Sequence, residues 1–378
     1  MTHLRFSVII VTFNALHHLK RFLPSVLRSR YTNLEIIIAD NASTDGTSEW
    51  IERTFKTISV VHLNKNYGYC GGNNRAAKAG TGDILLFLNN DVEVEPNWLR
   101  PLEEAFWEDP LLAALQPKLL AYKDKRSFEY AGAAGGFLDR YGYPFCRGRV
   151  FETLERDLGQ YDTSEEVLWA SGAALGVKRE LFFEVGGFDE DFDFHMDEID
   201  LCWRLRNLGF KVKCIPESTV YHLGGGSLAN GSPKKLYYNY RNNLLMLWKN
   251  LSEETLFRRF FTRCALDLLA ALRALVKRRF REFHAIVSAY ISFVSRMVST
   301  QRKRKALLLK RTEAKNPSTL LECFLVREYF LRGRRTFREL APPTEPGAQK
   351  LKVASSPRRE DQRKVAALSS SLGSSPPT

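Results

Sequence analysis

The 378-residue sequence predicts an α/β fold with a mostly parallel central sheet. Short β-branched runs alternate with stretches of helical spacing in the first half of the chain, which is the pattern of strand–helix–strand units. Polar clusters follow three of the expected strands. Because ligands of parallel sheets bind at the carboxyl ends of the strands, these clusters predict a binding site at that edge.

The first elements follow from apolar patterning. Two continuous β-branched runs, typical of strands buried on both faces, occupy Phe6–Thr12 and Leu34–Ala39. Helical spacing separates them at Leu16–Ser29. The expected elements that follow are a helix at Thr47–Phe55, a strand at Ile58–Leu63, a short helix at Asn73–Ala79 and a strand at Asp83–Leu88.

The middle of the chain is less regular. Leu111–Leu120 predicts a further strand, and residues 121–165 are irregular and rich in aromatic side chains. Such a segment either lines an acceptor cleft or forms an ordinary packed insertion. Apolar residues at Leu168–Val177 predict a return to strand, and Arg179–Val185 predicts a short helix.

Charge is distributed unevenly along the sequence. The chain carries a net +13, yet residues 251–378 hold 27 Lys and Arg against 11 Asp and Glu, whereas the first 250 residues hold 29 against 32. A basic segment can meet an anionic membrane, nucleic acid or acidic ligands. No nucleic-acid-binding signature accompanies it, so no nucleic acid is expected. Six scattered cysteines and an N-terminus without a signal-peptide pattern predict reduced thiols in a cytoplasmic protein.

The basic C-terminal third predicts amphipathic helices. Leu256–Val276 and Phe280–Met297 carry apolar stripes flanked by arginines, and Leu320–Leu340 is a third candidate. The longest charge-free piece, Phe283–Ser295, is too short to span a bilayer comfortably. We therefore expect a catalytic domain at 1–250, a helical region at 251–340 that lies on the inner face of the cytoplasmic membrane, and a disordered tail at 341–378. Helices packed on the catalytic domain are the alternative.

A cluster of acids suggests chemistry. Asp197, Glu198 and Asp200 begin an apolar helical run, and the turn His222–Gly226 follows about twenty residues later. Neighbouring carboxylates repel unless a proton, a metal or a cationic group compensates them. The cluster therefore predicts a general base or a metal site, although acids at a solvated helix start are the alternative.

Three sequence blocks resemble a family-2 glycosyltransferase of the inverting, nucleotide-sugar-dependent kind. SVIIVTFN with DNASTDGT resembles the nucleotide-binding half, LLFLNNDVEVEP the metal motif, and FHMDEIDLCWRLRNLG with VYHLGGGS the acceptor-side acid motif and its histidine. Within the family, the likeness is to the rhamnosyltransferase-like branch that builds surface polysaccharides. The resemblance implies a nucleotide-diphospho-sugar transferase (GT-A-like) fold, which the alternating strand pattern independently suggests.

The resemblance also implies roles for individual residues. A divalent cation, Mg²⁺ or Mn²⁺, would be held by Asp91 and His222, although Asn89 and Asn90 stand where the family often has an Asp. Hard cations take oxygen ligands, and donor phosphates would supply the rest. The donor-binding residues implied by the motifs are Thr12, Asn14, Asp40, Asn66, Gly72, Asn89 and Asn90. Asp40 resembles the acceptor of a nucleobase hydrogen bond, with Asp45 instead a helix cap. Glycines in 66–73 would let the backbone approach a phosphate or sugar, although a plain loop is the alternative.

Glu198 is favoured by position as the general base, with Asp197 as the alternative because the family usually shows Glu-Asp and here the order is swapped. Asp200 is expected to position its neighbours, with Arg204 one turn later, while Leu201 and Trp203 are expected in the helix core. The expected function is transfer of a sugar from a nucleoside diphosphate to a lipid-linked or polysaccharide acceptor with inversion. A metal-dependent sugar-nucleotide nucleotidyltransferase, a basic nucleic-acid-binding protein and a non-catalytic sugar-binding relative are the alternatives.

Overall fold

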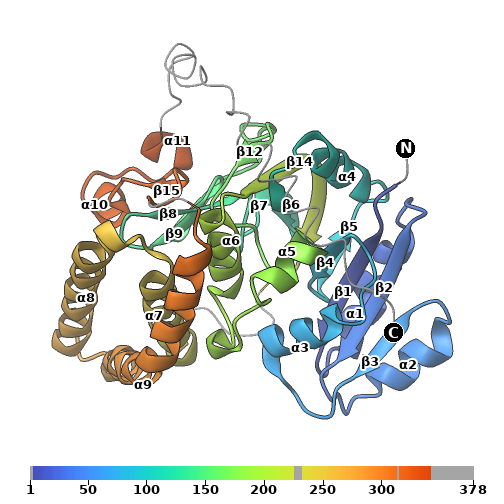
Figure 1. Ribbon diagram of the computed structural model, residues 1–378, viewed down its shortest axis with the longest axis horizontal. Helices are drawn as coiled ribbons and strands as arrows, with labels where there is room; N and C mark the ends of the chain where they lie inside the picture. The colour runs from blue at the N-terminus through green and yellow to red at the C-terminus, as the bar shows by residue number, and fades with distance from the viewer. Residues whose placement is uncertain (1–2, 225–231, 313–314, 342–378) are drawn as a thin grey trace.

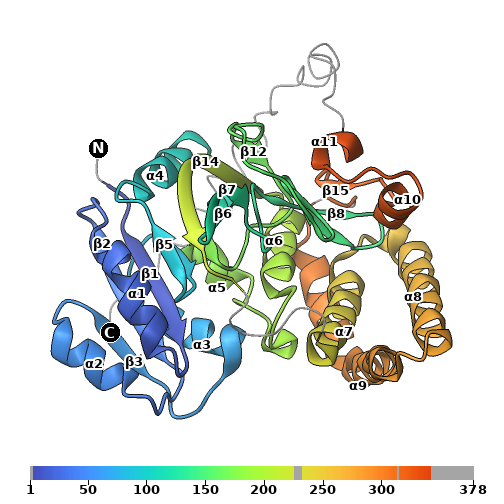
Figure 2. The same ribbon diagram turned by 180° about the vertical axis from the view of Figure 1, so that it is seen from behind.

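The computed structural model describes residues 3–224, 232–312 and 315–341, and Figure 1 shows their arrangement. The tail expected from Pro342 onward, and Gly225 and Gly226 of the glycine turn, lie outside the described residues. A large sheet and a helical C-terminal region lie at opposite ends of the molecule, with α6 (Asp197–Asn207) between them in both views (Figures 1 and 2).

The larger sheet has ten strands, which are β1 Phe6–Thr12, β2 Leu34–Asp40, β3 Ser59–His62, β4 Ile84–Leu88, β5 Val92–Val94, β6 Leu112–Ala121, β7 Asp124–Phe128, β12 Glu165–Glu166, β13 Ala174–Lys178 and β14 Lys211–His222. The smaller sheet comprises β8 Gly136–Asp139, β9 Pro144–Cys146, β10 Arg149–Val150, β11 Thr153–Leu154 and β15 Leu320–Leu321. Besides α6 and a 3-10 turn at Glu190–Phe192, the helices are α1 Leu16–Leu27, α2 Thr47–Thr54, α3 Gly68–Ala77, α4 Leu99–Glu108, α5 Arg179–Glu184, α7 Pro233–Asn250, α8 Glu253–Val276, α9 Phe280–Lys310, α10 Leu325–Phe330 and α11 Phe337–Leu340.

The strand order of the large sheet confirms the α/β class and a largely parallel central sheet, with one reversed strand inside it. The order is β12-β14-β6-β13-β4-β1-β2-β3, and β3, β2, β1 and β4 are parallel. Strand β13 enters between β4 and β6 antiparallel to both. A buried strand reads as a continuous apolar run in either direction, so the sequence pattern could not reveal this reversal.

The irregular segment 121–165 forms most of the smaller sheet, which the C-terminal strand β15 completes by pairing with β8. Close packing fixes this sheet, because a Cβ on Gly136 would lie 2.0 Å from the ring of Trp169. The expected strand at Leu168–Val177 is correspondingly shorter. Its first residues bond back to Gly136 instead, with Leu168 N donating to Gly136 O at 2.9 Å.

The expected helix at Leu320–Leu340 is wrong. The segment folds instead as β15, α10 and α11. Its backbone is recruited by the smaller sheet, and the N–H of Leu325 donates to the buried carboxylate of Asp139 at 2.9 Å. Gly333 then adopts φ +69° between α10 and α11, a left-handed conformation that interrupts any helix. Tertiary pairing therefore overrides the helical spacing of this segment.

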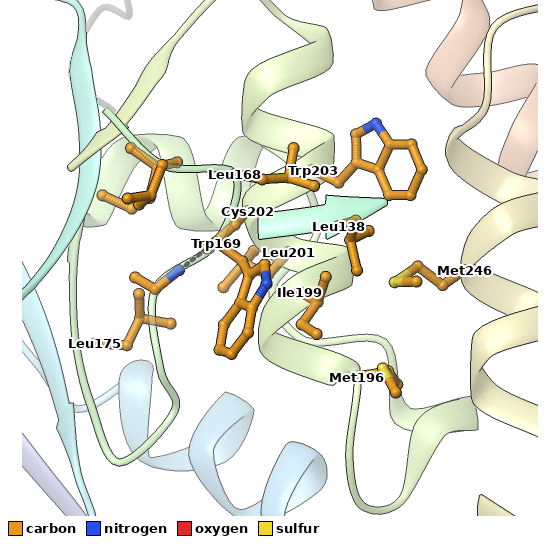
Figure 3. Close-up of a cluster of buried hydrophobic side chains, with 14 of the residues drawn as sticks. Leu138, Leu168, Trp169, Leu175, Met196, Ile199, Leu201, Cys202, Trp203 and Met246 are labelled. Atoms are coloured by element: carbon orange, nitrogen blue, oxygen red, sulfur yellow. Dashed lines mark hydrogen bonds between the residues drawn. The ribbon is translucent and has the colours of Figure 1, made fainter. Parts of the chain in front are cut away.

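Two hydrophobic clusters cover the two faces of the large sheet. One cluster contains side chains of α1, α2 and α4 together with Phe6, Val8 and Ile10 of β1. The other cluster contains side chains of α3, α5 and α6. Leu201 and Trp203 of α6 are fully buried in the second cluster, as expected from the sequence. Figure 3 shows them beside Leu138 of β8 and Trp169, with Met196, which directly precedes α6, near Met246 of α7. The helix that begins with Asp197 and Glu198 is thus packed into the hydrophobic core.

The long helices α8 and α9 form a hairpin that packs against α7 (Figures 1 and 2). The contact is aromatic, since Trp248 of α7 lies 5.0 Å from the Phe260 ring and 6.4 Å from the Phe293 ring. Arg304 of α9 closes the end of α7 by donating to the carbonyls of Trp248 and Leu251 at 2.9 and 2.7 Å. Among the helices in the described ranges, none is long and apolar enough to cross a membrane.

Candidate active site

The carboxyl ends of the parallel strands bring several expected donor residues together. Thr12 at the end of β1 is in register with Asp40 at the end of β2. Asn90, two residues beyond β4, points its amide nitrogen at the Thr12 hydroxyl, 3.4 Å away. The parallel register of β2, β1 and β4 therefore aligns these three polar residues along one edge.

Asp40 is buried and already partly satisfied. One carboxylate oxygen accepts from the Ser43 N–H at 2.9 Å, and the other from the Ser48 hydroxyl. Asp45 has a local role, because it accepts from the N–H of Thr47 at the start of α2 and from the N–H of Leu16 at the start of α1. This agrees with the expectation that Asp45 caps a helix.

Asn14 and Asn66 shape the turns that border the strand ends. Asn14 has φ 49°, a left-handed conformation that Asn tolerates, and its side-chain oxygen accepts from the Thr44 N–H at 2.8 Å. Asn66 accepts from the N–H of Gly68 at 2.8 Å, an Asx turn that leads into α3. Their observed contacts hold the two loops in place.

The glycines at 68–72 do not form a loop. They lie in the first turns of α3, which begins five residues before the expected helix start. A Cβ on Gly72 would lie 2.8 Å from Asn41 Nδ2 and 2.8 Å from Val11 Cγ1, so the glycine permits close packing of α3 on the strand ends. Asn41, which the sequence reasoning missed, connects the end of β2 to the start of α3. Its side chain donates to Gly68 O at 3.0 Å and accepts from Tyr67 N at 3.1 Å.

The residues expected to hold a metal are adjacent. His222 Nε2 lies 3.1 Å from Asp91 Oδ1, and His222 Nδ1 lies 3.3 Å from Glu129 Oε1. Burial lowers the pKa of His222, but the close contacts with the carboxylates of Asp91 and Glu129 outweigh it and raise the pKa to about 10. Burial acts to raise the pKa of Asp91, yet the contact with His222 leaves it below its ordinary value. Glu129 follows the irregular strand β7, so no motif pointed to it.

These residues fit a divalent cation in part. Asp91 offers a buried carboxylate oxygen, and His222 offers an imidazole whenever it is neutral. Over residues 3–224, 232–312 and 315–341, however, no three His, Cys, Asp or Glu side chains are arranged to hold a metal by themselves. A cation at Asp91 would therefore require further oxygen ligands from a bound phosphate group.

Asp197 and Glu198 start helix α6 beside the donor-side helix α3. The Tyr69 hydroxyl of α3 donates to Gly172 O at 2.7 Å, and a Cβ on Gly172 would lie 3.7 Å from Glu198 Cβ. Burial raises the pKa of Glu198 to about 7. Burial, followed by the charge of Glu198, raises the pKa of Asp197 well above its ordinary value. Asp197 is also more deeply buried than Glu198.

Asp200 belongs to a buried ion-pair network. Its carboxylate lies 2.9 Å from Arg204 Nε and 2.8 Å from Lys249 Nζ, and it accepts from Asn250 Nδ2 at 2.8 Å. The expected pairing with Arg204 is confirmed. Because its lone pairs are engaged by cations of α6 and α7, Asp200 fixes the two helices together rather than facing a ligand.

The network generates a stability prediction. Asp200→Asn removes a fully buried negative charge and leaves Arg204 and Lys249 with one partner fewer, so the free energy of unfolding should fall by about 3 kcal/mol. Urea denaturation followed by tryptophan fluorescence measures this change. Unaltered stability together with lost catalysis would instead make Asp200 a direct participant in the reaction.

Comparison with known proteins finds a family and several relatives that this chain resembles. Residues 7–169 match the family model for glycosyl transferase family 2. The chain is 28% identical over 258 residues to an N-acetylglucosaminyl-diphospho-decaprenol L-rhamnosyltransferase of Mycobacterium tuberculosis, covering 64% of this chain and 83% of that protein. It is 29% identical over 239 residues to the O-antigen biosynthesis protein RfbC of Myxococcus xanthus, but spans only 18% of that relative and 61% of this chain is aligned.

Solved structures share the fold at low identity. GalNAc-T7, solved with UDP, GalNAc and Mn²⁺, superposes with a TM-score of 0.53 at 19% identity, over 67% of this chain and 49% of its own. S. aureus TarS in complex with UDP-GlcNAc superposes with a TM-score of 0.51 at 17% identity, over 81% of this chain and 87% of its own. Residues 7–169 therefore form a glycosyl transferase family 2 domain.

Proposed function

We propose that this protein transfers a sugar from a nucleoside-diphosphate sugar to a lipid-linked or polysaccharide acceptor, with inversion, in the biosynthesis of a cell-surface glycan. The observation that carries the proposal is Glu198, a carboxyl with a pKa of about 7 that adjoins the donor-side helix α3. The mycobacterial and myxobacterial relatives, named for rhamnosyl transfer to a decaprenol-linked sugar and for O-antigen biosynthesis, support the acceptor class and a rhamnosyl donor as the first candidate.

The proposed chemistry is a single displacement. An acceptor hydroxyl oxygen forms a bond to the anomeric carbon, the bond from that carbon to the diphosphate oxygen breaks, and the nucleoside diphosphate leaves with the electron pair. The hydroxyl proton moves to Glu198. A general base works best with a pKa near the operating pH, which favours Glu198. Burial, followed by the charge of Glu198, also raises the pKa of Asp197 well above its ordinary value, so Asp197 remains the alternative base.

The donor would lie along the strand-end edge. Asp40, Asn90 and Thr12 face this edge, with Asp40 proposed to accept a hydrogen bond from the nucleobase. Asp91 and His222 would hold Mg²⁺ or Mn²⁺ there, and the bound cation would neutralise charge on the leaving diphosphate. His222 would have to be neutral to hold the cation, since a metal-ligating imidazole is neutral.

A lipid-linked acceptor implies contact with a membrane, and the α8–α9 hairpin provides a suitable surface. We define the hairpin face as the large apolar side chains that point away from the rest of the protein, namely Phe257, Phe261, Leu268, Leu272, Leu275, Val276, Phe280, Ile291, Val294 and Val298. Five cations surround its turn, namely Arg273, Lys277, Arg278, Arg279 and Arg281. Exposed apolar and basic side chains together match an anionic bilayer.

The hairpin face also lies close to the catalytic domain. Pro233 at the start of α7 shares a surface hollow with Phe280, Arg281 and His284 at the start of α9. The hairpin turn therefore adjoins the start of α7. We therefore propose a cytoplasmic, peripheral protein that binds the inner face of the cytoplasmic membrane through α8 and α9.

Asp91 provides the test of donor and metal. A screen of nucleotide sugars for nucleoside-diphosphate release with polyprenyl-linked acceptor extract should identify a donor, and Asp91→Ala should abolish that release because the diphosphate loses its proposed cation ligand. Binding of Mn²⁺, followed by electron paramagnetic resonance in the presence of the nucleoside diphosphate, should weaken in parallel. Full activity in excess chelator would refute the metal role.

Glu198→Gln tests the base. The amide keeps the shape of the side chain but accepts no proton, so the rate of transfer should fall by at least about a hundredfold. The donor KM should change little. If Asp197→Asn is the crippling variant and Glu198→Gln is mild, the order of the two roles is reversed.

The hairpin face is tested by liposome flotation of the full-length protein, because β15 pairs residues 320–321 with β8 and a truncation would remove part of a sheet. The double variant Val276→Glu/Phe280→Glu should lose flotation with anionic vesicles, since both side chains are exposed at the turn. High salt should also release the parent protein. Leu158→Glu, at an equally exposed position between β11 and β12, is the matched control. Equal flotation of both variants would contradict the membrane proposal.

A further inference from the structure

The segment that leads into α6 is conformationally strained. Asp193, His195 and Met196 have φ values of 59°, 67° and 66°, although none of them is glycine. Residues in such conformations persist only where surrounding contacts enforce them. Met196 directly precedes Asp197, the first residue of α6, and no side chain caps this helix end. The geometry of the strained segment therefore sets the direction in which Asp197 and Glu198 leave it.

Asn242 of α7 enforces this geometry. Its fully buried amide nitrogen donates to three carbonyl oxygens of the segment, those of Phe192, Phe194 and His195, at 2.7, 2.6 and 2.9 Å. Backbone carbonyls that converge on one donor cannot be satisfied in the same way if the segment relaxes. The amide thus selects a single conformation of the backbone before α6.

Arg241 adds further hydrogen bonds to the same segment and orients the side-chain amide of Asn242. Its Nη2 donates to the carbonyls of Asp191 and Phe192 at 2.9 and 2.8 Å, and lies 3.1 Å from a carboxylate oxygen of Asp193. Its Nε donates to the Asn242 side-chain oxygen at 2.8 Å, which directs the amide nitrogen toward the segment. The arginine is 2% exposed, so these contacts are made away from bulk water.

Cations from α7 and α9 hold the turn just before this segment. Lys249 of α7 lies 2.6 Å from Asp189, and Lys303 of α9 lies 2.5 Å from both Asp189 and Asp191. The whole approach to α6 is thereby tied to the C-terminal helices. None of these contacts reaches the donor edge, so their consequence for the reaction passes through α6.

We propose that Arg241 and Asn242 are positioning residues, which hold the strained segment 193–196 so that Glu198 is presented to the acceptor in its buried orientation. This proposal rests on the proposed role of Glu198 as the base. Its structural part, the enforced burial of Glu198, is independent of any donor or acceptor. The two parts therefore call for separate measurements.

The titration of Glu198 reports its burial. The titratable groups that face it are Asp197 and Cys202 of α6, Tyr69 and Cys70 of α3, and Cys146 of β9. Burial raises the pKa of the tyrosine and of each cysteine, so these groups stay neutral between pH 5 and pH 8. Within that window, the carboxyls of Glu198 and Asp197 are the facing groups that can change charge.

The first experiment compares thermal unfolding of the full-length parent and Glu198→Gln at pH 5 and pH 8. Burial raises the folded-state pKa of Glu198 from 4.5 to about 7, so its stabilising contribution is complete below about pH 4.5 and is lost as the pH rises through 7. Glu198→Gln does not titrate. The Tm of the variant relative to the parent should therefore increase by about 2–4 °C between pH 5 and pH 8.

The same comparison is then made in an Asn242→Ala background. If the hydrogen bonds of Asn242 keep Glu198 buried, Glu198 becomes more exposed to water in the Asn242→Ala background. The increase in the relative Tm of Glu198→Gln between pH 5 and pH 8 should then shrink to less than half. Asn243→Ala is the matched control, because Asn243 is the adjacent, equally buried amide on α7 and donates instead to Gly142 O at 2.6 Å. It should lower the Tm but leave the increase unchanged.

Arg241→Lys gives the answer if Asn242→Ala does not fold, because lysine keeps the charge and loses the guanidinium fork. An undiminished pH-dependent increase in the foldable variant would overturn the proposal and reduce Arg241 and Asn242 to packing residues. With a donor in hand, Arg241→Lys should lower kcat at least tenfold while changing the donor KM less than twofold. Failure to find a donor would count against the proposed function alone, since the unfolding comparison needs none.

Discussion

The carboxylates in the first turn of α6 constrain the whole C-terminal half of the molecule. Asp200 is fully buried and needs cationic partners, which are Arg204 on its own helix and Lys249 near the end of α7. That pairing requires α7 to run beside α6. The same placement brings Arg241 and Asn242, two turns earlier on α7, onto the strained approach to α6. One buried charge thereby specifies the frame in which Glu198 is held.

The three carboxyl groups of the cluster illustrate how environment separates chemically similar side chains. Asp200 faces cations and accepts an amide hydrogen bond. Asp197 and Glu198 face a tyrosine hydroxyl and thiols, and burial raises the pKa of both. The cluster can therefore anchor two helices through one member and accept a proton through another. The neighbouring groups, which are cations only in the case of Asp200, assign the roles.

Helices α8 and α9 serve two surfaces at once. Phe260 and Phe293 point inward to Trp248, whereas Phe257 and Phe261, one turn before and one residue after Phe260, point outward. Likewise Arg263 is buried against Asp267, while Arg273 and Lys277 remain exposed. The two alternatives expected from the sequence, packing on the catalytic domain and presentation of an apolar basic surface, are thus compatible. Packing is observed, and the exposed face supports the proposed membrane contact.

The sequence by itself determined the strands at Phe6–Thr12, Leu34–Ala39 and Asp83–Leu88 to within one residue of their observed bounds, because buried parallel strands require continuous apolar runs. It also placed Asp40 and Asp91 at or just beyond the ends of two of these strands. It also indicated the pairing of Asp200 with Arg204, since residues four apart share a helix face. Only tertiary structure decided the direction of β13, the conversion of 320–340 into a strand and short helices, and the inclusion of Gly71 and Gly72 in α3. Glu129, Arg241 and Asn242 were equally beyond sequence reasoning. Their partners lie 93, 48 and 50 residues away in the chain, and no local pattern encodes a contact that depends on how distant segments pack.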